Sequence, residues 1–212
     1  MPGKPTGTRA LPRLPRFSSV ACLLLACSLL VVAAPAHAEP PVTEISQFRL
    51  ERADEGVLLS ANVNFELPPV IEDVLQKGIP MFFVAETAVF RDRWYWYDKQ
   101  VSSVARHMRL SYQPLTRRWR LLVSASQIGN SGPALGQNFD TQEEALAAVQ
   151  RISRWKIAEP GELEGEANYS VDFRFRLDVS QLPRPFQIGV VGRSDWNIIA
   201  ARNQRVVLES AR

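Results

Sequence analysis

Hydrophobic and polar residues alternate along several stretches of this chain, and the longest such stretch covers residues 167–179. One set of alternate positions is apolar, consisting of Ala167, Tyr169, Val171, Phe173, Phe175, Leu177 and Val179. The positions between them are polar or charged, namely Asn168, Ser170, Asp172, Arg174, Arg176 and Asp178. Successive side chains of a strand point to opposite faces of its sheet, so this period of two predicts a long antiparallel strand. One face of that strand should lie in the core and the other in water.

The same alternation predicts two β-hairpins. Residues 57–67 repeat the pattern and follow the strand-like segment 44–52 across a turn of four residues. Residues 108–112 and 119–123 alternate on either side of a loop at 113–118. Each pair of segments is close enough in sequence to form neighbouring antiparallel strands.

A buried strand and a short helix are predicted between these hairpins. Residues 79–90 carry apolar residues on both faces, which is typical of a central strand. The helix before it should begin at Pro68 and Pro69 and run through Lys77, with Gly78 as its stop.

A second helix is predicted from Asp140, where Thr141 and Glu144 have the spacing of a capping box. Its apolar face would consist of Ala145, Ala148, Val149 and Ile152. Residues 182–186 contain two prolines, which cannot donate hydrogen bonds to a neighbouring strand. We therefore expect an extended segment there, leaving the long strand.

These elements favour a mainly β fold, an antiparallel β-sandwich of about seven or eight strands with two short helical insertions. A closed barrel is the alternative. No linker-like run and no internal repeat divides residues 39–212, so we expect one domain of immunoglobulin-like size. A chain of this length buries roughly 70% of its unfolded surface, which is enough for a hydrophobic core.

Residues 1–38 have the three parts of a secretory signal: a basic stretch over 4–16, an apolar run over 20–34, and small residues before Glu39. Ala36 and Ala38 occupy the −3 and −1 positions of the predicted cleavage site. An apolar run of 15 residues is shorter than the roughly 20 needed to span a bilayer, so an uncleaved anchor is the weaker interpretation. A lipoprotein modified at Cys27 is the other alternative.

Charge and cysteine content exclude several function classes. The whole chain has 25 Lys and Arg against 22 Asp and Glu, a net charge of +3. Four of those bases and none of the acids lie in residues 1–38, so the remaining 174 residues carry a net charge of −1. Both cysteines, Cys22 and Cys27, also lie in residues 1–38. The predicted domain therefore has no disulfide framework, Cys-rich metal site or Cys nucleophile, and no general basic surface for nucleic acid.

The predicted domain contains one histidine, His107. A Ser-His-Asp triad would have to use it, yet the chain has no Gly-x-Ser-x-Gly elbow. One imidazole cannot build a typical zinc site, and no phosphate-binding loop, dinucleotide fingerprint or EF-hand pattern is present. We expect a surface histidine, and a protein that is not an enzyme and uses no metal or cofactor.

The most concentrated candidate chemistry is the aromatic and basic segment at residues 91–99. Read as a strand, it places Trp94 and Trp96 on one face. The other face then carries Arg91, Arg93, Tyr95, Tyr97 and Lys99. One interpretation is that the tryptophans fill the core while the basic stems cover the tyrosine rings. Another is a protein-binding face, because Tyr, Trp and Arg are the usual hot-spot residues of interfaces. A third is that the tryptophans stack on a sugar.

Five arginines surround the second predicted hairpin: Arg106, Arg109, Arg117, Arg118 and Arg120. Arg118 and Arg120 alternate with Trp119 and Leu121, so they should point outwards. A solvated sheet face accounts for the set, since charged edges discourage wrong strand pairing. A patch attracted to anionic lipid headgroups or to an acidic partner is the alternative.

Ordered sequence blocks connect the chain to a known family. They are RDRWYWYDK at 91–99, LSY at 110–112 with LT at 115–116, QNFDT at 137–141, SQLPRPFQ at 180–187 and SDWN at 194–197. In these blocks the chain resembles a proteobacterial family of exported proteins known only as a domain of unknown function. The resemblance implies an exported protein and brings no established activity, cofactor or catalytic residue. Genes of that family often neighbour two-component sensor kinases, which implies a sensor kinase as a partner.

The sequence thus favours a periplasmic, non-enzymatic domain that binds an envelope or inner-membrane protein. The residues expected to carry binding are Arg91, Arg93, Trp94, Tyr95, Trp96 and Tyr97, with Arg118 and Arg120 second. Peripheral contact with a membrane remains open for the arginine-rich hairpin. The alternative function is a small-ligand module that stacks a sugar or peptidoglycan fragment on Trp94 or Trp96.

Overall fold

The computed structural model describes residues 43–93, 97–128, 134–163, 168–190, 194–206 and 209–210. The strands are β1 (Glu44–Ala53), β2 (Gly56–Asn64), β3 (Met81–Arg91), β4 (Lys99–Gln113), β5 (Arg118–Ser124), β6 (Leu135–Phe139), β7 (Arg151–Ala158), β8 (Tyr169–Leu177), β9 (Ile199–Arg205) and β10 (Glu209–Ser210). The α-helices are α2 (Pro69–Gln76), α3 (Gln142–Gln150) and α4 (Arg184–Val190). Two single 3₁₀ turns, η1 (Val179–Gln181) and η2 (Ser194–Trp196), flank α4. Strands predominate, so the mainly β class is confirmed.

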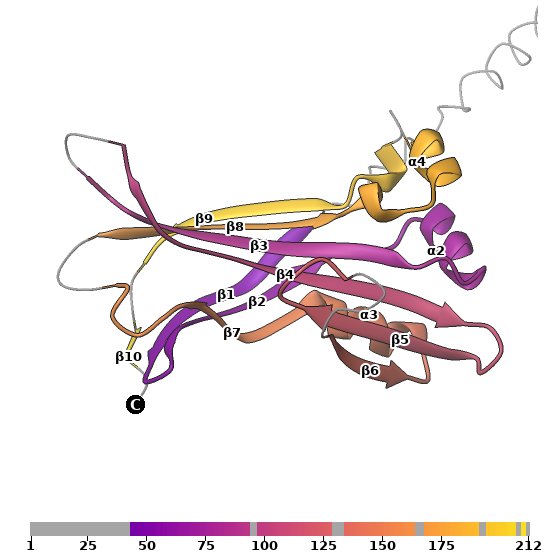
Figure 1. Ribbon diagram of the computed structural model, residues 1–212, viewed down its shortest axis with the longest axis horizontal. Coiled ribbons are helices and arrows are strands. Elements are labelled where there is room, and N and C mark those ends of the chain that lie inside the picture. The colour runs from indigo at the N-terminus through magenta and orange to yellow at the C-terminus, as the bar shows by residue number, and fades with distance from the viewer. Residues whose placement is uncertain are drawn as a thin grey trace, which may run out of the picture. The chain divides into compact units, whose positions relative to one another are not determined.

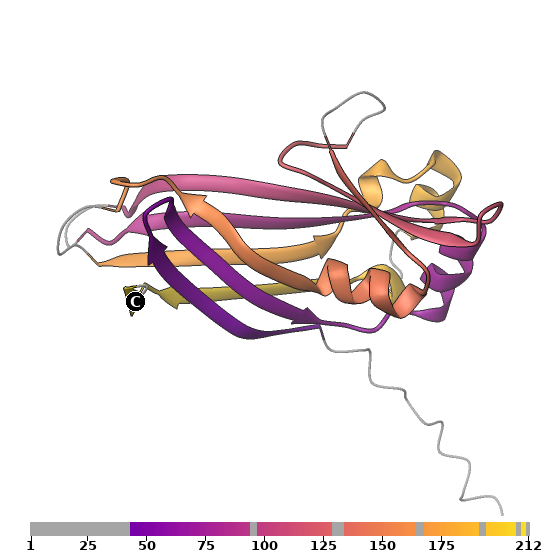
Figure 2. The same ribbon diagram turned by 90° about the horizontal axis from the view of Figure 1, so that it is seen from below.

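The strands form two open sheets that pack face to face (Figure 1). The larger sheet is antiparallel throughout and has the order β6-β5-β4-β3-β8-β9. The smaller sheet contains β1, β2 and β7, and the two-residue β10 adds to β1 in parallel. Figure 2 shows the indigo β1 and β2 lying across the long strands of the larger sheet. The sandwich is therefore confirmed, and the described strands close no barrel.

The two hairpins and the central strand predicted from alternation are present. β1 and β2 pair across a turn before Gly56, and β4 pairs with β5. β3 lies between β4 and β8. In β8 the buried positions are Tyr169, Val171, Phe173, Phe175 and Leu177, as the period of two requires.

Both predicted helices are present, but the second one ends earlier than expected. In α3 the hydroxyl of Thr141 accepts a hydrogen bond from the backbone N–H of Glu144 at 3.2 Å, which is the predicted N-terminal cap. The helix stops at Gln150, and Ile152 belongs to β7. Ile152 is nevertheless buried, because β7 continues along the same side of the core.

The extended segment expected at residues 182–186 is only partly present. Leu182 is extended, but α4 begins at Arg184, and the backbone N–H of Phe186 donates to the carbonyl of Pro183 at 2.9 Å. The prediction is therefore wrong from Arg184 onwards. Pro185 is the second residue of that helix. Proline is tolerated in a first helical turn, where backbone N–H groups have no partner within the helix.

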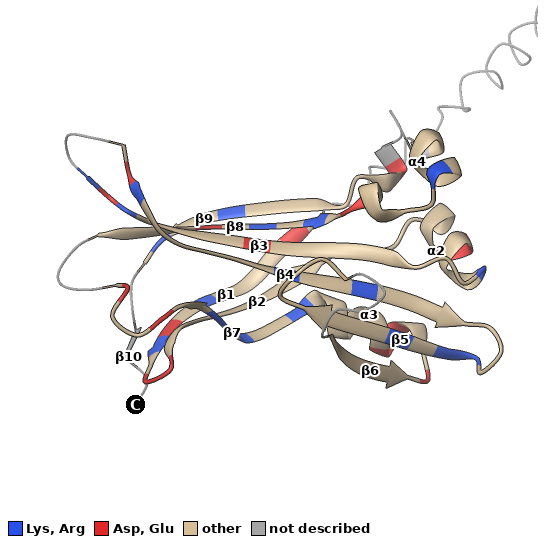
Figure 3. Cartoon of the chain, viewed as in Figure 1, with Lys and Arg blue, Asp and Glu red and all other residues tan. Residues whose placement is uncertain are grey.

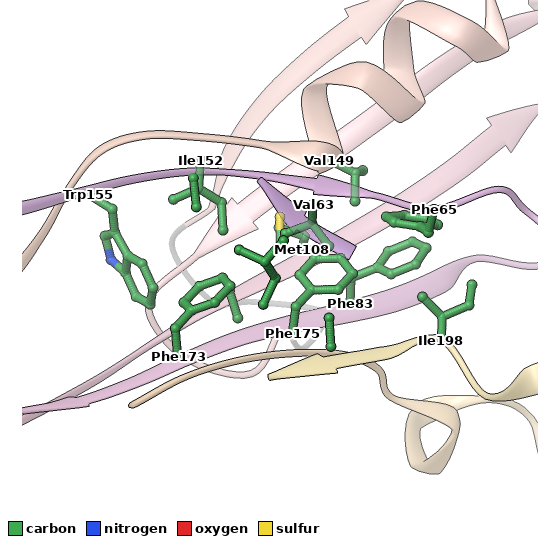
Figure 4. Packing of buried hydrophobic residues seen from close by; sticks show 14 of the residues in the cluster. Val63, Phe65, Phe83, Met108, Val149, Ile152, Trp155, Phe173, Phe175 and Ile198 are labelled. Carbon is green, nitrogen blue, oxygen red and sulfur yellow. The ribbon is translucent and has the colours of Figure 1, made fainter. Parts of the chain in front are cut away.

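The core lies between the two sheets (Figure 4). Phe65 contacts the rings of Phe83 and Phe175, with ring centroids 5.6 Å and 5.5 Å away. Phe173 packs against Phe48 of β1, with centroids 5.9 Å apart. These contacts join the larger sheet to the smaller one. Among the described helices, none has the length and apolar character that a membrane crossing requires.

Candidate functional site

The aromatic and basic segment is the tip of the β3–β4 hairpin rather than a continuous strand, which corrects the sequence-based expectation. Arg91 is the last residue of β3 and pairs with Lys99, the first residue of β4. Between these two residues, the described Asp92, Arg93, Tyr97 and Asp98 belong to no strand. Figure 1 shows the ends of β3 and β4 rising away from the other strands at the left. The tip is therefore a projection and not part of a flat sheet face.

The described side chains of this tip face solvent. Arg91, Arg93 and Lys99 are exposed, and Tyr97 is 95% exposed. Two backbone contacts hold the base of the tip. The N–H of Arg93 donates to the carboxylate of Asp98 at 3.2 Å, and the N–H of Asp92 donates to the carbonyl of Asn168 at 2.9 Å. A fully exposed tyrosine beside three bases is a surface able to contact another molecule.

Trp94, Tyr95 and Trp96 lie outside the described residues. The core-filling and sugar-stacking interpretations both depend on the two tryptophans. They therefore remain predictions, and the candidate site consists of its described members.

Arg118 and Arg120 are exposed, as their alternation with the buried Trp119 and Leu121 predicts. Arg118 forms an exposed ion pair with Asp140 at 3.1 Å. The register places these arginines opposite Gln113 and Ser111, at the far end of β4 from Lys99. At about 3.3 Å per residue the two ends of β4 are about 45 Å apart. Figure 3 shows basic residues both at the β3–β4 tip and along β5. The two groups of basic residues thus form separate surfaces.

His107 is half-buried rather than fully on the surface. It lies in β4 between Val84 of β3 and Ser124 of β5, on the face of the larger sheet that points away from the core. Its Nδ1 atom is buried and has no hydrogen-bond partner. No cluster of three potential metal ligands occurs among the described His, Cys, Asp and Glu residues.

Arg106 departs most from the sequence-based interpretation, which placed it on a solvated face. It has the same parity in β4 as Met108 and Leu110, so its side chain lies between the two sheets. Its guanidinium carbon is 5.2 Å from the ring centroid of Trp155 in β7. Burial lowers the pKa of Arg106 from its ordinary value because removal of water disfavours the charged form. An arginine nevertheless stays charged at neutral pH.

The expectation of a solvated face is therefore wrong for Arg106, and no motif in the sequence marks Trp155 as its partner. The alternation of β4 indicates that Arg106 points towards the core, because Arg106 is two residues before the buried Met108.

The comparisons with known proteins agree with the resemblance noted above. No curated protein and no solved structure gives a significant match to this chain. Residues 41–205 match the family described as Domain of unknown function (DUF4390), and this match covers most of the chain, including every strand from β1 to β9. The chain therefore belongs to the DUF4390 family, a family of unknown function.

Proposed function

We propose that this protein is a non-enzymatic binding domain of the cell envelope, and that it docks another protein through the tip of the β3–β4 hairpin. The observation that carries the proposal is the 95% exposure of Tyr97 at the end of a projecting hairpin. A tyrosine buries a large area on binding at a low entropic cost, since it has only two side-chain torsions. An exposed aromatic beside arginines is the composition of an interface hot spot.

The charges of the tip favour an acidic partner surface. Arg91, Arg93 and Lys99 are all exposed bases. Of the two tip acids, Asp98 accepts the hydrogen bond from the Arg93 backbone. Three bases at one projecting end raise the rate of encounter with an acidic surface and set the orientation of docking. The basic n-region and apolar run of residues 1–38 support an envelope location, where an inner-membrane protein such as a sensor kinase would be the partner.

Site-specific photo-cross-linking tests the proposal. A photo-reactive amino acid replaces Tyr97 in the full chain, expressed in its native cell, and adducts are identified by mass spectrometry after fractionation of the envelope. The matched control places the same group at Leu115, which is 101% exposed in the loop of the β4–β5 hairpin, at the other end of β4. We expect one envelope protein to be captured at position 97 and not at position 115.

Charge reversal at the tip is the second part of the cross-linking experiment. Arg91→Glu with Arg93→Glu should abolish the adduct at position 97, while Arg118→Glu with Arg120→Glu should leave it unchanged. Equal labelling at positions 97 and 115, or an adduct that survives reversal of the tip charges, would overturn the assignment of the tip. A chain retained in the cytoplasmic fraction would overturn the envelope location.

A further inference from the structure

A groove of about 550 Å³ lies where the larger sheet extends past the edge of the smaller one. One wall is the inner face of β5 and β6, which contributes Leu121, Val123 and Leu135. The opposite wall comes from α3 and β7, with Ala148 and Trp155. The helix packs against β5 and β6 and limits the groove on that side. A volume of this size is ordinary for a small-molecule site.

Arg106 lies in this groove with its hydrogen-bonding capacity unused. Among the described residues no carboxylate, carbonyl or hydroxyl accepts a hydrogen bond from its guanidinium group. Trp155 covers one face of the group at 5.2 Å. Stacking uses the flat face of a guanidinium and leaves its N–H donors, which point outwards in the plane, available for another molecule.

Arg202 shows what a purely structural arginine looks like in the same fold. It also lies on the inner face of the larger sheet, and it stacks on Phe48 of the smaller sheet at 5.3 Å. Unlike Arg106, it donates a hydrogen bond to the carbonyl of Ile45 at 3.2 Å. The two arginines make the same kind of contact between sheets, but of the two only Arg106 donates no hydrogen bond to another described residue.

The rest of the lining selects the chemistry of an occupant. The second charged residue is Arg151, and no Asp or Glu is among the described residues that line the groove. The remaining polar residues of the lining are the neutral Ser124, Gln137 and Ser153. Two cations without an acid favour an anion, and the apolar walls favour a hydrocarbon body. Leu135 is 72% exposed at the mouth, so an occupant would remove apolar surface from water there.

We propose that this groove binds an amphipathic carboxylate, an aliphatic chain that ends in a single carboxylate group. The carboxylate pairs with the free in-plane donors of Arg106, a geometry in which two parallel N–H···O bonds form. The aliphatic chain lies along Leu121, Val123 and Leu135. This groove is separate from the tip of the β3–β4 hairpin. The proposal of a carboxylate site therefore does not depend on the proposed docking function.

Calorimetric titration of the purified full chain with decanoate tests the proposal, and decanol is the uncharged probe of equal chain length. We expect saturable binding of decanoate with one site and at least tenfold weaker binding of decanol. Arg106→Met should weaken decanoate binding at least tenfold. Arg202→Met is the matched control, since it removes a stacked arginine outside the groove, and it should leave the decanoate affinity within twofold of the original.

Leu135→Asp keeps the test decisive if Arg106→Met fails to fold. Leu135 is exposed, so the substitution spares the core, yet it places a negative charge at the mouth of the groove. It should weaken decanoate at least tenfold and decanol much less. Decanol binding as tightly as decanoate, unchanged decanoate affinity in the folded Arg106→Met or Leu135→Asp variant, or no saturable binding of decanoate would each overturn the proposal.

Discussion

Replacing Phe173 by alanine should remove one of the aromatic contacts between the two sheets. Phe173 is 1% exposed at the middle of β8, opposite Thr87 of β3, and its ring packs against Phe48 of the smaller sheet. An aromatic side chain buries about 150–250 Å², which at about 25 cal/mol per Å² corresponds to about 4–6 kcal/mol. Alanine retains some of this burial and the unfolded chain is partly compact, so we expect a loss of about 3–5 kcal/mol.

Urea unfolding followed by fluorescence, together with a thermal melt, measures this loss. A domain of this size loses about 2–4 °C of Tm per kcal/mol, so Phe173→Ala should melt about 6–20 °C lower. Arg174→Ala is the matched control, because Arg174 is the next residue, is exposed, and makes no hydrogen bond or ion pair with another described residue. It should change the free energy of unfolding by less than about 0.5 kcal/mol.

The comparison also tests the register of β8. A slip by one residue would exchange its two faces and make Arg174 the buried position. Equal destabilisation by the two substitutions, or a loss below about 1 kcal/mol for Phe173→Ala, would refute the packing described between β8 and β1.

Two further substitutions test local features. Burial alone would raise the pKa of the Asp178 carboxyl, but hydrogen bonds from Ser180 and Gln181 and the charge of Arg176 together lower it. A lowered folded-state pKa stabilises the protein above the unfolded value of about 4, and this contribution is lost as the pH falls. Asp178→Asn should therefore cost about 1–3 kcal/mol in urea unfolding at pH 7 and less at pH 3, whereas a constant cost would contradict this assignment. Gly56 has φ +126°, and an added Cβ would overlap the carbonyl oxygen of Ala158. Gly56→Ala should therefore lower the urea midpoint by an amount equivalent to at least about 1–3 kcal/mol, and an unchanged midpoint would contradict the close approach of β2 and β7.

Strands that alternate over many residues could be predicted from sequence, and those with an interrupted pattern could not. In β7 the buried residues Ile152 and Trp155 are three positions apart, a spacing typical of a helix. The cause is a β-bulge, because Arg154 has φ +43° and the pairing with β2 shifts there. The extra residue brings both side chains to the same face. This spacing is why the sequence pattern predicts Ile152 as part of the preceding helix.

Strand β6 and helix α4 gave weaker signals. The residues of β6 are exposed or half-buried, so no alternation of apolar and polar positions marks this edge strand. The prolines at 183 and 185, just before and inside the first turn of α4, predict an extended chain, since both lack an N–H group. They lie at a helix start, where that N–H is not needed.

The position of Arg106 follows from the alternation of inward and outward side chains along β4. Arg106 could have been placed inside the sandwich from Met108 and Leu110 alone. Arg106 is close in sequence to arginines that face solvent, and grouping it with them predicts the wrong face. The stacking on Trp155 could not be predicted, because it joins strands from different sheets and requires the bulge in β7. Exposure of the β3–β4 tip likewise depends on where pairing ends at Arg91.

The order of strands in the two sheets has a consequence for how the chain folds. The segments from β1 to β6 can pair with close neighbours, but β3 must wait for β8, where Phe83 pairs with Leu177, 94 residues further on. Likewise Leu59 of β2 pairs with Trp155 of β7. At about 5–20 residues per second, synthesis of those 94 residues takes about 5–20 s. Throughout that interval the free edges of β2 and β3 can pair with other chains. Non-local pairing of this kind also slows folding to milliseconds or seconds, so the nascent domain benefits from protection until β8 is complete.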